Sequence, residues 1–358
     1  TRCGRDWSSD VCSSDLKPLP DGVDIFTKYL RDAGYAIGFP GHGKKDWGFI
    51  EPTSPPYDIG NWDSLTQKQP FFCQYQFYDT HRVNKKIDGT FFPFLPCPEH
   101  PVDRANVELH PYTPDTPEAR EELGAYLENV NLLDMKIGAL LADLKAKGLY
   151  ETTIIVVMGD NGPPIFRGKG FLYERGIRMP LIVRIPERFR PGVKPGTITD
   201  ELVSALDMAP TFIDLAGGTI PDYMEGRIFF GPNQQPEPEY LFAMRDRHGM
   251  NVDRCRSVAS KTDKYIRNYV RGMTCFENSL GNVAGSRAGL KLFEQGKLSA
   301  AQAAYYTDKP EEELYDLTTD PFELNNLAQD PAREETLTKF RKALTGWIDE
   351  TEDDGAFE

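Results

Sequence analysis

The sequence lacks the features of a membrane protein and of a nucleic-acid-binding protein. No apolar run approaches the ~18 residues that would span a bilayer, and the mean hydropathy is −0.50. Basic residues are outnumbered: 41 Lys and Arg stand against 55 Asp and Glu, which gives a net charge of −14 over 358 residues. A chain of this charge repels phosphate backbones. We therefore expect a globular protein that has neither a membrane nor nucleic acid as a partner.

Cysteine is also scarce and is not spaced as a zinc ligand. The six cysteines lie at positions 3, 12, 73, 97, 255 and 275. This spacing argues against a zinc site. One or two disulfides are compatible with the number, but spacing alone does not identify a pairing.

The N-terminal residues 1–16, TRCGRDWSSDVCSSDL, show no helical or strand period and no hydrophobic centre of a signal peptide. Their near-repeat of SSD indicates a translated sequencing adapter fused to the reading frame. We therefore treat 1–16 as a non-native segment that packs against nothing, and Cys3 and Cys12 as incidental.

From residue 17 on, helices and apolar strands alternate. Apolar residues recur every three or four positions from Pro117 to Gly148, which predicts one long helix. Residues 154–158, IIVVM, predict a strand buried on both faces. A further helix is predicted over 24–33, and strands over 35–39 and 71–77. This alternation predicts an α/β fold over 17–235, with a mainly parallel central sheet flanked by helices.

The pattern changes after residue 235. Short, closely spaced strands are predicted over 240–244, 255–260, 264–269 and 313–317. Residues 288–306 read as helical, and 331–348 as an amphipathic helix whose inward positions are Leu337, Phe340, Leu344 and Trp347. We therefore expect residues 236–358 to form a smaller subdomain with an antiparallel sheet and a terminal helix.

Polar side chains follow each predicted strand of the main domain. In chain order they are His42, Lys44, Lys45 and Asp46, then Asp79 and His81, then Asp160 and Asn161, and finally Lys169. Ligands of open α/β sheets bind beyond the carboxyl ends of the strands. We therefore expect Asp160, His81 and Lys169 to converge within roughly 10 Å of one another.

The chemistry of these groups suits an anionic substrate held beside a cation. The Asp160-Asn161 pair offers hard oxygens, which favour Ca²⁺ or Mg²⁺ over zinc. Lysines and a histidine around such a cation suit an oxyanion such as sulfate or phosphate. Each group also has a structural interpretation, because Asp-Asn-Gly is a common turn and a single histidine is often a hydrogen-bonded structural residue. The shared sheet edge favours a site.

Four segments resemble the sulfatase family. GDNG with RGKGFLYERGIRMPLIVRIP (159–186) resembles its second signature, in which a strand ends in Asp-Asn and a lysine-glycine-x-x-tyrosine-glutamate segment follows. FFCQYQFYDTHR (71–82) resembles the strand that ends in a histidine. YLRDAGYAIGF (29–39) and EELYDLTTDPFELNNLA (312–328) resemble the elements before the lysine loop and the C-terminal signature. The likeness is greatest to heparan N-sulfatase-like and arylsulfatase-A-like enzymes of the alkaline-phosphatase-like superfamily.

The resemblance implies roles for individual residues. Asp160 and Asn161 would be ligands of one Ca²⁺, and Lys169 would bind a sulfate oxygen. His81 would contact the sulfate or protonate the leaving-group oxygen as a general acid. In the first loop, Lys44 would be the catalytic lysine, but Asp46 stands where the family usually has a histidine. Either that histidine is lost or His42 takes its place against the substrate.

Two basic residues of the C-terminal part are candidates for reading a sugar. Arg245 and His248 lie in the run MRDRH, at the end of a predicted strand. From there they would reach the mouth of the site. A solvated turn is the alternative interpretation of this run.

The formylglycine nucleophile that the resemblance implies has no precursor in this chain. Sulfatases make it from a Cys or Ser in the motif C/S-x-P/A-x-R, and neither Cys97-Pro98-Glu99-His100-Pro101 nor Cys12-Ser13-Ser14-Asp15-Leu16 fits the motif. The paired N-terminal aspartates of the family's metal site are missing too. We therefore expect an N-terminally truncated sulfatase that is inactive by itself, from a parent protein that is periplasmic or extracellular.

Three functions remain open at this point. The first is a fragment of a calcium-dependent sulfatase, acting on a sulfated sugar or an aryl sulfate through an O- or N-sulfate bond. The second is a phosphatase or phosphodiesterase of the same superfamily. The third is an inactive module that binds a sugar or a cation. The nucleophile motif would distinguish them.

Overall fold

The computed structural model describes residues 17–41, 49–50, 55–83, 85–87, 90–190, 194–248, 251–277, 283–353 and 355. They divide into two compact units. The first unit takes the described residues through Tyr78 and those from 194 to Glu239, and the second takes those from Asp79 to 190 and from Tyr240 on. Residues 1–16, His42 and Lys44 lie outside the described residues.

The chain passes from the first unit to the second between Glu239 and Tyr240. This boundary is close to residue 236, the predicted start of the C-terminal subdomain. Residues 79–190, which the sequence assigned to the main domain, belong to the same unit as the C-terminal part. The functional division into 17–235 and 236–358 stays a prediction.

Among its described residues, the first unit contains a small sheet of two parallel strands together with three α-helices. Its elements are α1 (Phe26–Asp32), β1 (Ala36–Gly38), α2 (Trp62–Thr66), β2 (Phe71–Cys73) and α5 (Met208–Leu215). β1 and β2 run parallel, with Ala36 opposite Phe71. Leu30 and Ile37 are buried together with Ile213 of α5. The predicted helix and strands are confirmed, but β2 ends four residues early, where its short partner β1 ends.

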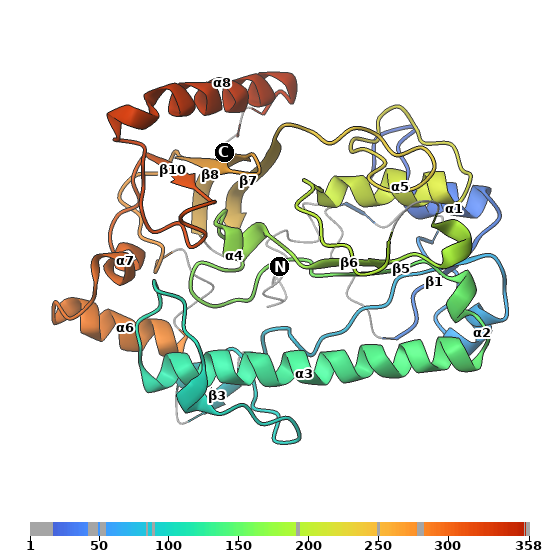
Figure 1. Cartoon of the computed structure of the whole chain (residues 1–358), viewed down its shortest axis with the longest axis horizontal. Coiled ribbons are helices and arrows are strands. Elements are labelled where there is room, and N and C mark those ends of the chain that lie inside the picture. Colours follow the sequence, from blue (N-terminus) through green and yellow to red (C-terminus); the bar gives the residue numbers. More distant parts are fainter. Residues whose placement is uncertain are drawn as a thin grey trace. The chain divides into compact units, whose positions relative to one another are not determined.

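The second unit holds the other strands and the longest helix (Figure 1). Its first part contains β3 (Lys85–Ile87), β4 (Thr90–Phe92), α3 (Pro117–Ala146), β5 (Ile155–Met158), α4 (Glu174–Ile177) and β6 (Leu181–Arg184). Its second part contains β7 (Leu241–His248), β8 (Asn251–Ala259), β9 (Asp263–Asn268), α6 (Ala284–Glu294), α7 (Ala300–Ala303), β10 (Glu312–Asp316) and α8 (Glu334–Glu350).

α3 confirms the longest predicted helix. The Thr116 hydroxyl accepts a hydrogen bond from the backbone of Ala119, and Pro117 occupies the first turn, where its missing N–H costs nothing. Past the C-terminal end, Gly148 takes a φ of 69°, which glycine adopts without strain.

The strand predicted over 154–158 forms as β5, but the expected burial on both faces is wrong. β5 is only half-buried, and Met158 at its end is 43% exposed. Its partner is β6, which runs antiparallel because the chain returns directly through the loop at 159–180. Ile182 on β6 is 64% exposed. In the described part of the chain this pair has no further strand beside it, so its apolar side chains stay partly open.

The predicted C-terminal antiparallel sheet is confirmed. Its strands follow the order β10-β9-β8-β7, each antiparallel to the next. α8 covers it, with Leu337, Phe340 and Leu344 packed on Val258 and Leu314. With the helices and the parallel pair β1–β2, this sheet confirms the α/β class and its antiparallel subdomain.

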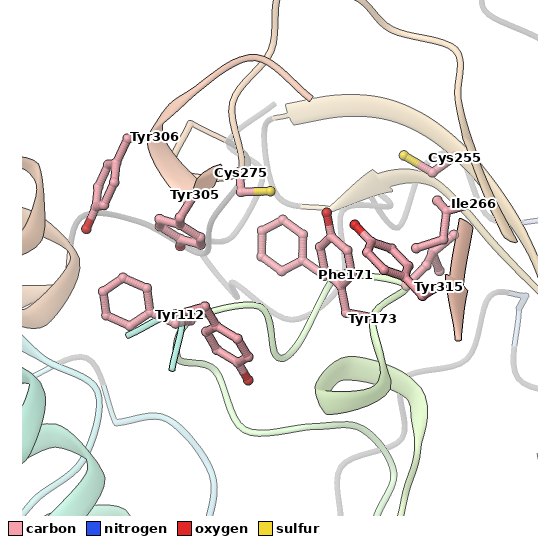
Figure 2. Packing of buried hydrophobic residues seen from close by; sticks show 11 residues of the cluster. Tyr112, Phe171, Tyr173, Cys255, Ile266, Cys275, Tyr305, Tyr306 and Tyr315 are labelled. Atoms are coloured by element: carbon pink, nitrogen blue, oxygen red, sulfur yellow. The ribbon is translucent and has the colours of Figure 1, made fainter. Parts of the chain in front are cut away.

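A second buried cluster of this unit is largely aromatic (Figure 2). It joins Phe171 and Tyr173 of the signature segment to Tyr305, Tyr306 and Tyr315 of the C-terminal part. The four described cysteines (73, 97, 255 and 275) are free thiols. No helix among the described residues combines the length and apolar character needed to cross a bilayer.

Candidate functional site

The loop between β5 and β6 contains three of the predicted site residues, Asp160, Asn161 and Lys169, and its backbone is tightly folded. The Gly162 N–H donates to the carbonyl of Gly176 at 3.0 Å. A Cβ at position 162 would lie 1.8 Å from the carbonyl oxygen of Arg175. Only glycine allows the two ends of the loop to approach this closely. The glycines that punctuate the sequence here therefore bring 160–162 against 175–176.

Asp160 and Asn161 follow β5 directly, as predicted. Asp160 is exposed, and its Oδ1 accepts the N–H of Asn161 at 2.8 Å. The Asn161 amide donates to the carbonyl of Gly162 at 2.9 Å. Among the described residues, Asp160 Oδ2 and Asn161 Oδ1 have no donor, so both oxygens are available to a ligand.

The two free oxygens of Asp160 and Asn161 are of the chemical type that Ca²⁺ binds. Both atoms are hard oxygens, but Ca²⁺ usually takes six to eight such ligands. No group of three or more His, Cys, Asp or Glu side chains suited to a metal is gathered within the described residues. Asp160 and Asn161 therefore suit one side of a calcium site whose other ligands come from outside this pair.

Lys169 is half-buried and is held by its backbone. Its N–H donates to the carbonyl of Pro163 at 3.0 Å. Its ammonium group has no hydrogen-bond or ion-pair partner among the described residues. A cation placed in this way can bind an anion without first breaking an internal pair.

The residue after Lys169 brings the end of β7 to this loop. The carbonyl of Gly170 accepts a hydrogen bond from Arg245 Nη1 at 2.5 Å. Gly170 has a φ of +89°, and a Cβ there would lie 3.0 Å from Nδ1 of His248. The structure thus places Arg245 and His248, both predicted substrate ligands, directly beside the Lys169 segment.

Arg245 has the environment of a structural residue. Its side chain is only 5% exposed, and Nη1 lies 3.6 Å from the carboxylate of the buried Asp253. These contacts leave little of the guanidinium for a sugar, so the predicted reading of substrate by Arg245 gains no support from its burial. His248 stays the better placed of the two candidates.

Tyr173 and Glu174 of the signature anchor it to the C-terminal part. Tyr173 donates its hydroxyl hydrogen to Glu313 Oε2 at 2.9 Å. Glu174 pairs with the fully buried Lys264 at 2.5 Å, and Lys264 also lies 3.1 Å from Glu323. A buried charge of either sign costs several kcal/mol if it is left alone, so these groups stay together.

Arg167 completes the anchoring. It has a φ of 56°, and its guanidinium carbon lies 3.6 Å from the centre of the Tyr173 ring. Its Nη1 donates to the carbonyl of Glu323 at 3.0 Å. Sequence reasoning did not single out Arg167, Lys264 or Glu323, because charged residues outside a motif are usually solvated. The one signal was the position of Arg167 and Glu323 inside segments that resemble the family.

His81 lies in the second unit with Asp160 and Lys169, on an exposed position. Its neighbour Asp79 is largely buried and pairs with Lys136 of α3 at 2.5 Å. The convergence of His81 with the other two residues within 10 Å stays a prediction.

Glu122 and His110 have shifted pKa values, and the sequence did not single them out. Burial raises the pKa of Glu122, on α3, to about 8. Its Oε1 accepts the N–H of Gly285 at the start of α6, at 2.8 Å. Burial and the guanidinium of Arg175 lower the pKa of His110 to about 4, so His110 is neutral at physiological pH.

Two family models match the sequence. The sulfatase model matches residues 61–218, and the model described as N-sulphoglucosamine sulphohydrolase, C-terminal, matches residues 164–277. The two matches overlap on the signature segment.

Curated relatives extend the likeness to nearly the whole chain. An ulvan-active sulfatase of Formosa agariphila is 31% identical over 371 residues, which cover 94% of this chain and 61% of the relative. Human N-sulphoglucosamine sulphohydrolase is 27% identical, with 80% of this chain and 62% of the relative covered. The chain therefore spans about three fifths of the length of these relatives.

Solved structures share the fold. A 2-O GAG sulfatase superposes with a TM-score of 0.61 at 18% identity, covering 97% of this chain and 78% of that one. A phosphonate monoester hydrolase from Silicibacter pomeroyi gives a TM-score of 0.57 at 16% identity, covering 94% and 82%. Likeness at these identities shows the α/β fold and does not decide the reaction. The family models, the curated relatives and the signature around Lys169 do decide the family: this chain belongs to the sulfatases.

Proposed function

We propose that the chain is part of a calcium-dependent sulfatase that hydrolyses sulfate groups of a sulfated carbohydrate. The observation that carries this proposal is the state of Lys169. Its ammonium group is left without a partner among the described residues, whereas the acid at the end of the same signature, Glu174, is paired inside the protein. A lysine kept free in a rigid segment is suited to a sulfate oxygen.

Lys169 acts on the charge of the reacting group. As the S–O bond breaks, negative charge grows on the leaving-group oxygen, and a fixed ammonium group close to the reacting sulfate group lowers the barrier. Because the backbone around Lys169 is held at Pro163 and at Gly170, little reorganisation is needed at that moment.

His81 is proposed to serve the leaving group. An imidazolium at this position donates its proton to the sugar oxygen as the S–O bond breaks, which avoids release of a free alkoxide. Lys44 is proposed to contact the sulfate from the first loop, with the family's histidine there either lost or replaced by His42, and His248 is proposed to contact the sugar.

Asp160 and Asn161 are proposed to hold the calcium ion through Asp160 Oδ2 and Asn161 Oδ1. When bound, Ca²⁺ supplies positive charge that orients the sulfate group and stabilises its oxygens. The pair is suited to this because its two free oxygens follow β5 directly and face no competing donor among the described residues.

The substrate class follows the names of the relatives. One of them is active on ulvan and another is an N-sulphoglucosamine sulphohydrolase. We therefore propose a sulfated polysaccharide or one of its sulfated sugars, with an aryl sulfate as a usable artificial substrate. A parent enzyme that meets such polymers acts in the periplasm or outside the cell.

We further propose that the 358-residue chain does not turn over by itself. It contains no C/S-x-P/A-x-R motif, and it spans 61% of the ulvan-active relative. Catalysis needs a nucleophile in line with the sulfur atom. Joining the chain to a native N-terminal segment that carries the motif, with its cysteine converted to formylglycine, should give sulfate release that a chelator abolishes.

The test measures sulfate release from 4-nitrophenyl sulfate and from a sulfated sugar, for the chain and for the joined enzyme. Lys169→Ala should lower the kcat of the joined enzyme by about 100- to 1,000-fold, the usual cost of one lost oxyanion donor. Asp160→Ala should abolish the calcium dependence together with most of the activity. Lys342→Ala, at an exposed position of α8, is the matched control and should change nothing.

The same assay separates the competing functions. The phosphonate monoester hydrolase shares the fold, so aryl phosphate and aryl phosphonate belong among the substrates tested. Turnover of these esters without turnover of sulfate esters would favour the phosphatase. Turnover of sulfate by the chain alone, or turnover in the joined enzyme that resists chelation, would contradict the proposed mechanism.

A further inference from the structure

The C-terminal sheet holds the segment after Lys169 at every residue. The contacts are those of the Gly170 carbonyl with Arg245, the Phe171 ring with Arg245, the Leu172 carbonyl with Lys264, the Tyr173 hydroxyl with Glu313, and the Glu174 carboxylate with Lys264. All of these residues belong to the second unit. The sheet therefore fixes the path of the backbone on the C-terminal side of the lysine.

The first of these contacts matters most for Lys169, because glycine does not fix its own backbone. At a φ of +89°, Gly170 has several accessible peptide orientations, and only outside contacts select one. The hydrogen bond from Arg245 to its carbonyl, at 2.5 Å, makes that selection. Together with the bond from the Lys169 N–H to Pro163, it restrains the chain on both sides of the lysine.

Arg245 is in turn fixed by a buried carboxylate. Asp253, on β8, is 1% exposed and lies 3.6 Å from Arg245 Nη1. Both oxygens of Asp253 also accept hydrogen bonds from Lys309, at 2.5 Å each. The Lys309 side chain is 4% exposed, so the pair is shielded from solvent. A shielded pair holds its geometry better than an exposed one, because water cannot replace either partner.

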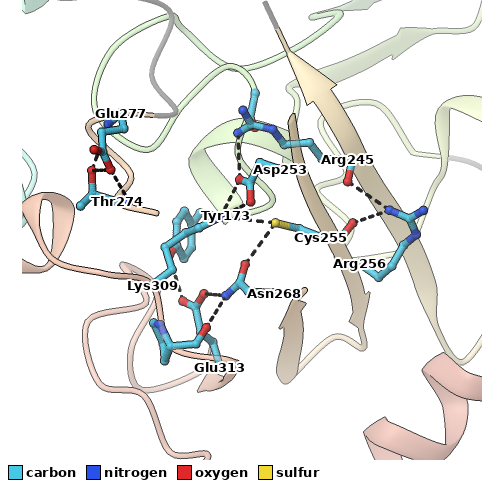
Figure 3. Close-up of polar contacts among 12 residues, drawn as sticks. Tyr173, Arg245, Asp253, Cys255, Arg256, Asn268, Thr274, Glu277, Lys309 and Glu313 are labelled. Carbon is cyan, nitrogen blue, oxygen red and sulfur yellow. Dashed lines mark hydrogen bonds and ion pairs between the residues drawn. The ribbon is translucent and has the colours of Figure 1, made fainter. Parts of the chain in front are cut away.

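The polar contacts continue from Lys309 back to the signature (Figure 3). Lys309 Nζ donates to Sγ of Cys255 at 3.5 Å, and this thiol donates to Asn268 Oδ1 at 3.1 Å. The Asn268 amide donates to Glu313 Oε1 at 2.6 Å, and Glu313 accepts the hydroxyl hydrogen of Tyr173. The path that leaves the signature at Gly170 thus returns to it three residues later.

We propose that Asp253, supported by Lys309, is a positioning residue for Lys169, acting through Arg245 and the Gly170 carbonyl. This inference rests on the proposed function, because it gives Lys169 the task of binding a sulfate oxygen. Asp253 touches no substrate. Its part is to hold Arg245 in the orientation in which it binds the Gly170 carbonyl and so restrains the backbone directly after Lys169.

The first test is hydrogen–deuterium exchange on the full 358-residue chain. In D253N the carboxylate charge is lost at nearly constant shape, so the exchange of the Lys169 and Phe171 amides should rise about tenfold or more. L337A provides the matched control, because Leu337 is 1% exposed in the α8 cluster and has no part in the polar path. L337A should lower the midpoint temperature of thermal unfolding. When L337A and wild type are each measured at the same number of degrees below their own midpoint, their exchange rates in 163–173 should agree within about twofold.

A second variant, R245K, tests the same contact in case D253N does not fold. R245K keeps the charge but not the reach of the guanidinium, and it should raise exchange in the same peptide as D253N does. R341M removes a more exposed ion pair, between α8 and Glu312 of β10, and should leave exchange in this peptide unchanged. Exchange in 163–173 that is no faster in D253N and R245K than in the two controls would overturn the proposal.

The kinetic readout distinguishes this inference from the proposed function. In the joined enzyme, D253N should lower kcat by about tenfold or more with KM within about twofold of wild type, since a displaced lysine chiefly loses transition-state contact. Faster exchange without any sulfate turnover in the parent enzyme would contradict the sulfatase function and leave the positioning intact. Full kcat in D253N together with sulfatase activity would contradict the positioning alone.

Discussion

At the scale of single residues, the signature 169–174 consists of one lysine without an internal partner among the described residues and several residues that anchor the segment. Lys169 has a free ammonium group, whereas Tyr173 and Glu174 are engaged with Glu313 and Lys264 inside the protein. The sequence motif alone does not reveal which of these residues is free to bind a ligand and which is anchored. The contacts hold the neighbours of the lysine, and our proposal is that they thereby keep Lys169 in position.

Glu122 gives a prediction about pH. Its ordinary pKa is 4.5, and burial raises the folded-state pKa to about 8. Below pH 4.5 both states are protonated and nothing is lost. Between the two values the unfolded chain ionises while the folded one keeps its proton, so the free energy of unfolding falls with rising pH, by up to about 1.4 kcal/mol per pH unit. Above pH 8 the loss is complete.

Urea denaturation between roughly pH 5 and 9 checks this prediction. The variant E122Q, which stays neutral, should lose less stability than wild type across the range. E108Q, at an exposed position, is the control and should follow the wild-type curve. Parallel curves for wild type and E122Q would show that Glu122 is ionised in the folded protein.

At the scale of elements, the same residue type has opposite effects in the loop and in the long helix. Gly162 sits where a Cβ would meet the Arg175 carbonyl oxygen at 1.8 Å, whereas Gly138 in α3 faces open space. The loop therefore needs its glycine for close backbone approach. The helix only loses stability from the extra freedom of its glycine in the unfolded chain.

This contrast predicts opposite signs for one substitution. Gly162→Ala should destabilise the protein by about 2–3 kcal/mol through overpacking. Gly138→Ala should stabilise it by about 0.5–1 kcal/mol. Thermal or urea unfolding of the two variants measures both changes. Equal effects at the two positions would mean that the loop can relax around the added methyl group.

At the scale of the whole molecule, the sequence predicted elements better than their environments. The helix starting at Pro117, the strand at 154–158 and the C-terminal sheet all exist, because each depends on local periodicity. The burial of β5 was wrong, since an apolar run does not reveal how many strands lie beside it. The same limit applies to the site: Lys169 and Asp160 follow from motif and strand position, whereas Asp253 and Lys264 depend on contacts between distant segments.

The exposure of β5 and β6 has a consequence for the molecule as a whole. Ile182 on β6 is 64% exposed and Met158 at the end of β5 is 43% exposed, and an apolar strand pair open to solvent tends to associate. A net charge of −14 opposes association at neutral pH, but 0.15 M salt screens charges beyond about 8 Å. We therefore expect aggregation to accelerate with salt and near the isoelectric point, which is about 5.0.

The same substitution, isoleucine to lysine, at two exposed positions tests whether the strand pair causes this association. Ile182→Lys should slow aggregation, measured by light scattering at constant salt, and shift stability by no more than about 0.5 kcal/mol because the side chain is already exposed. Ile198→Lys is the matched control, since Ile198 is 96% exposed in a loop and outside any strand. If the strand pair drives association, only the first variant slows it. If both variants aggregate like wild type, the contacts that join molecules lie elsewhere on the surface. If both slow equally, the added lysine acts by itself, and the exposed side chains of β5 and β6 play no part.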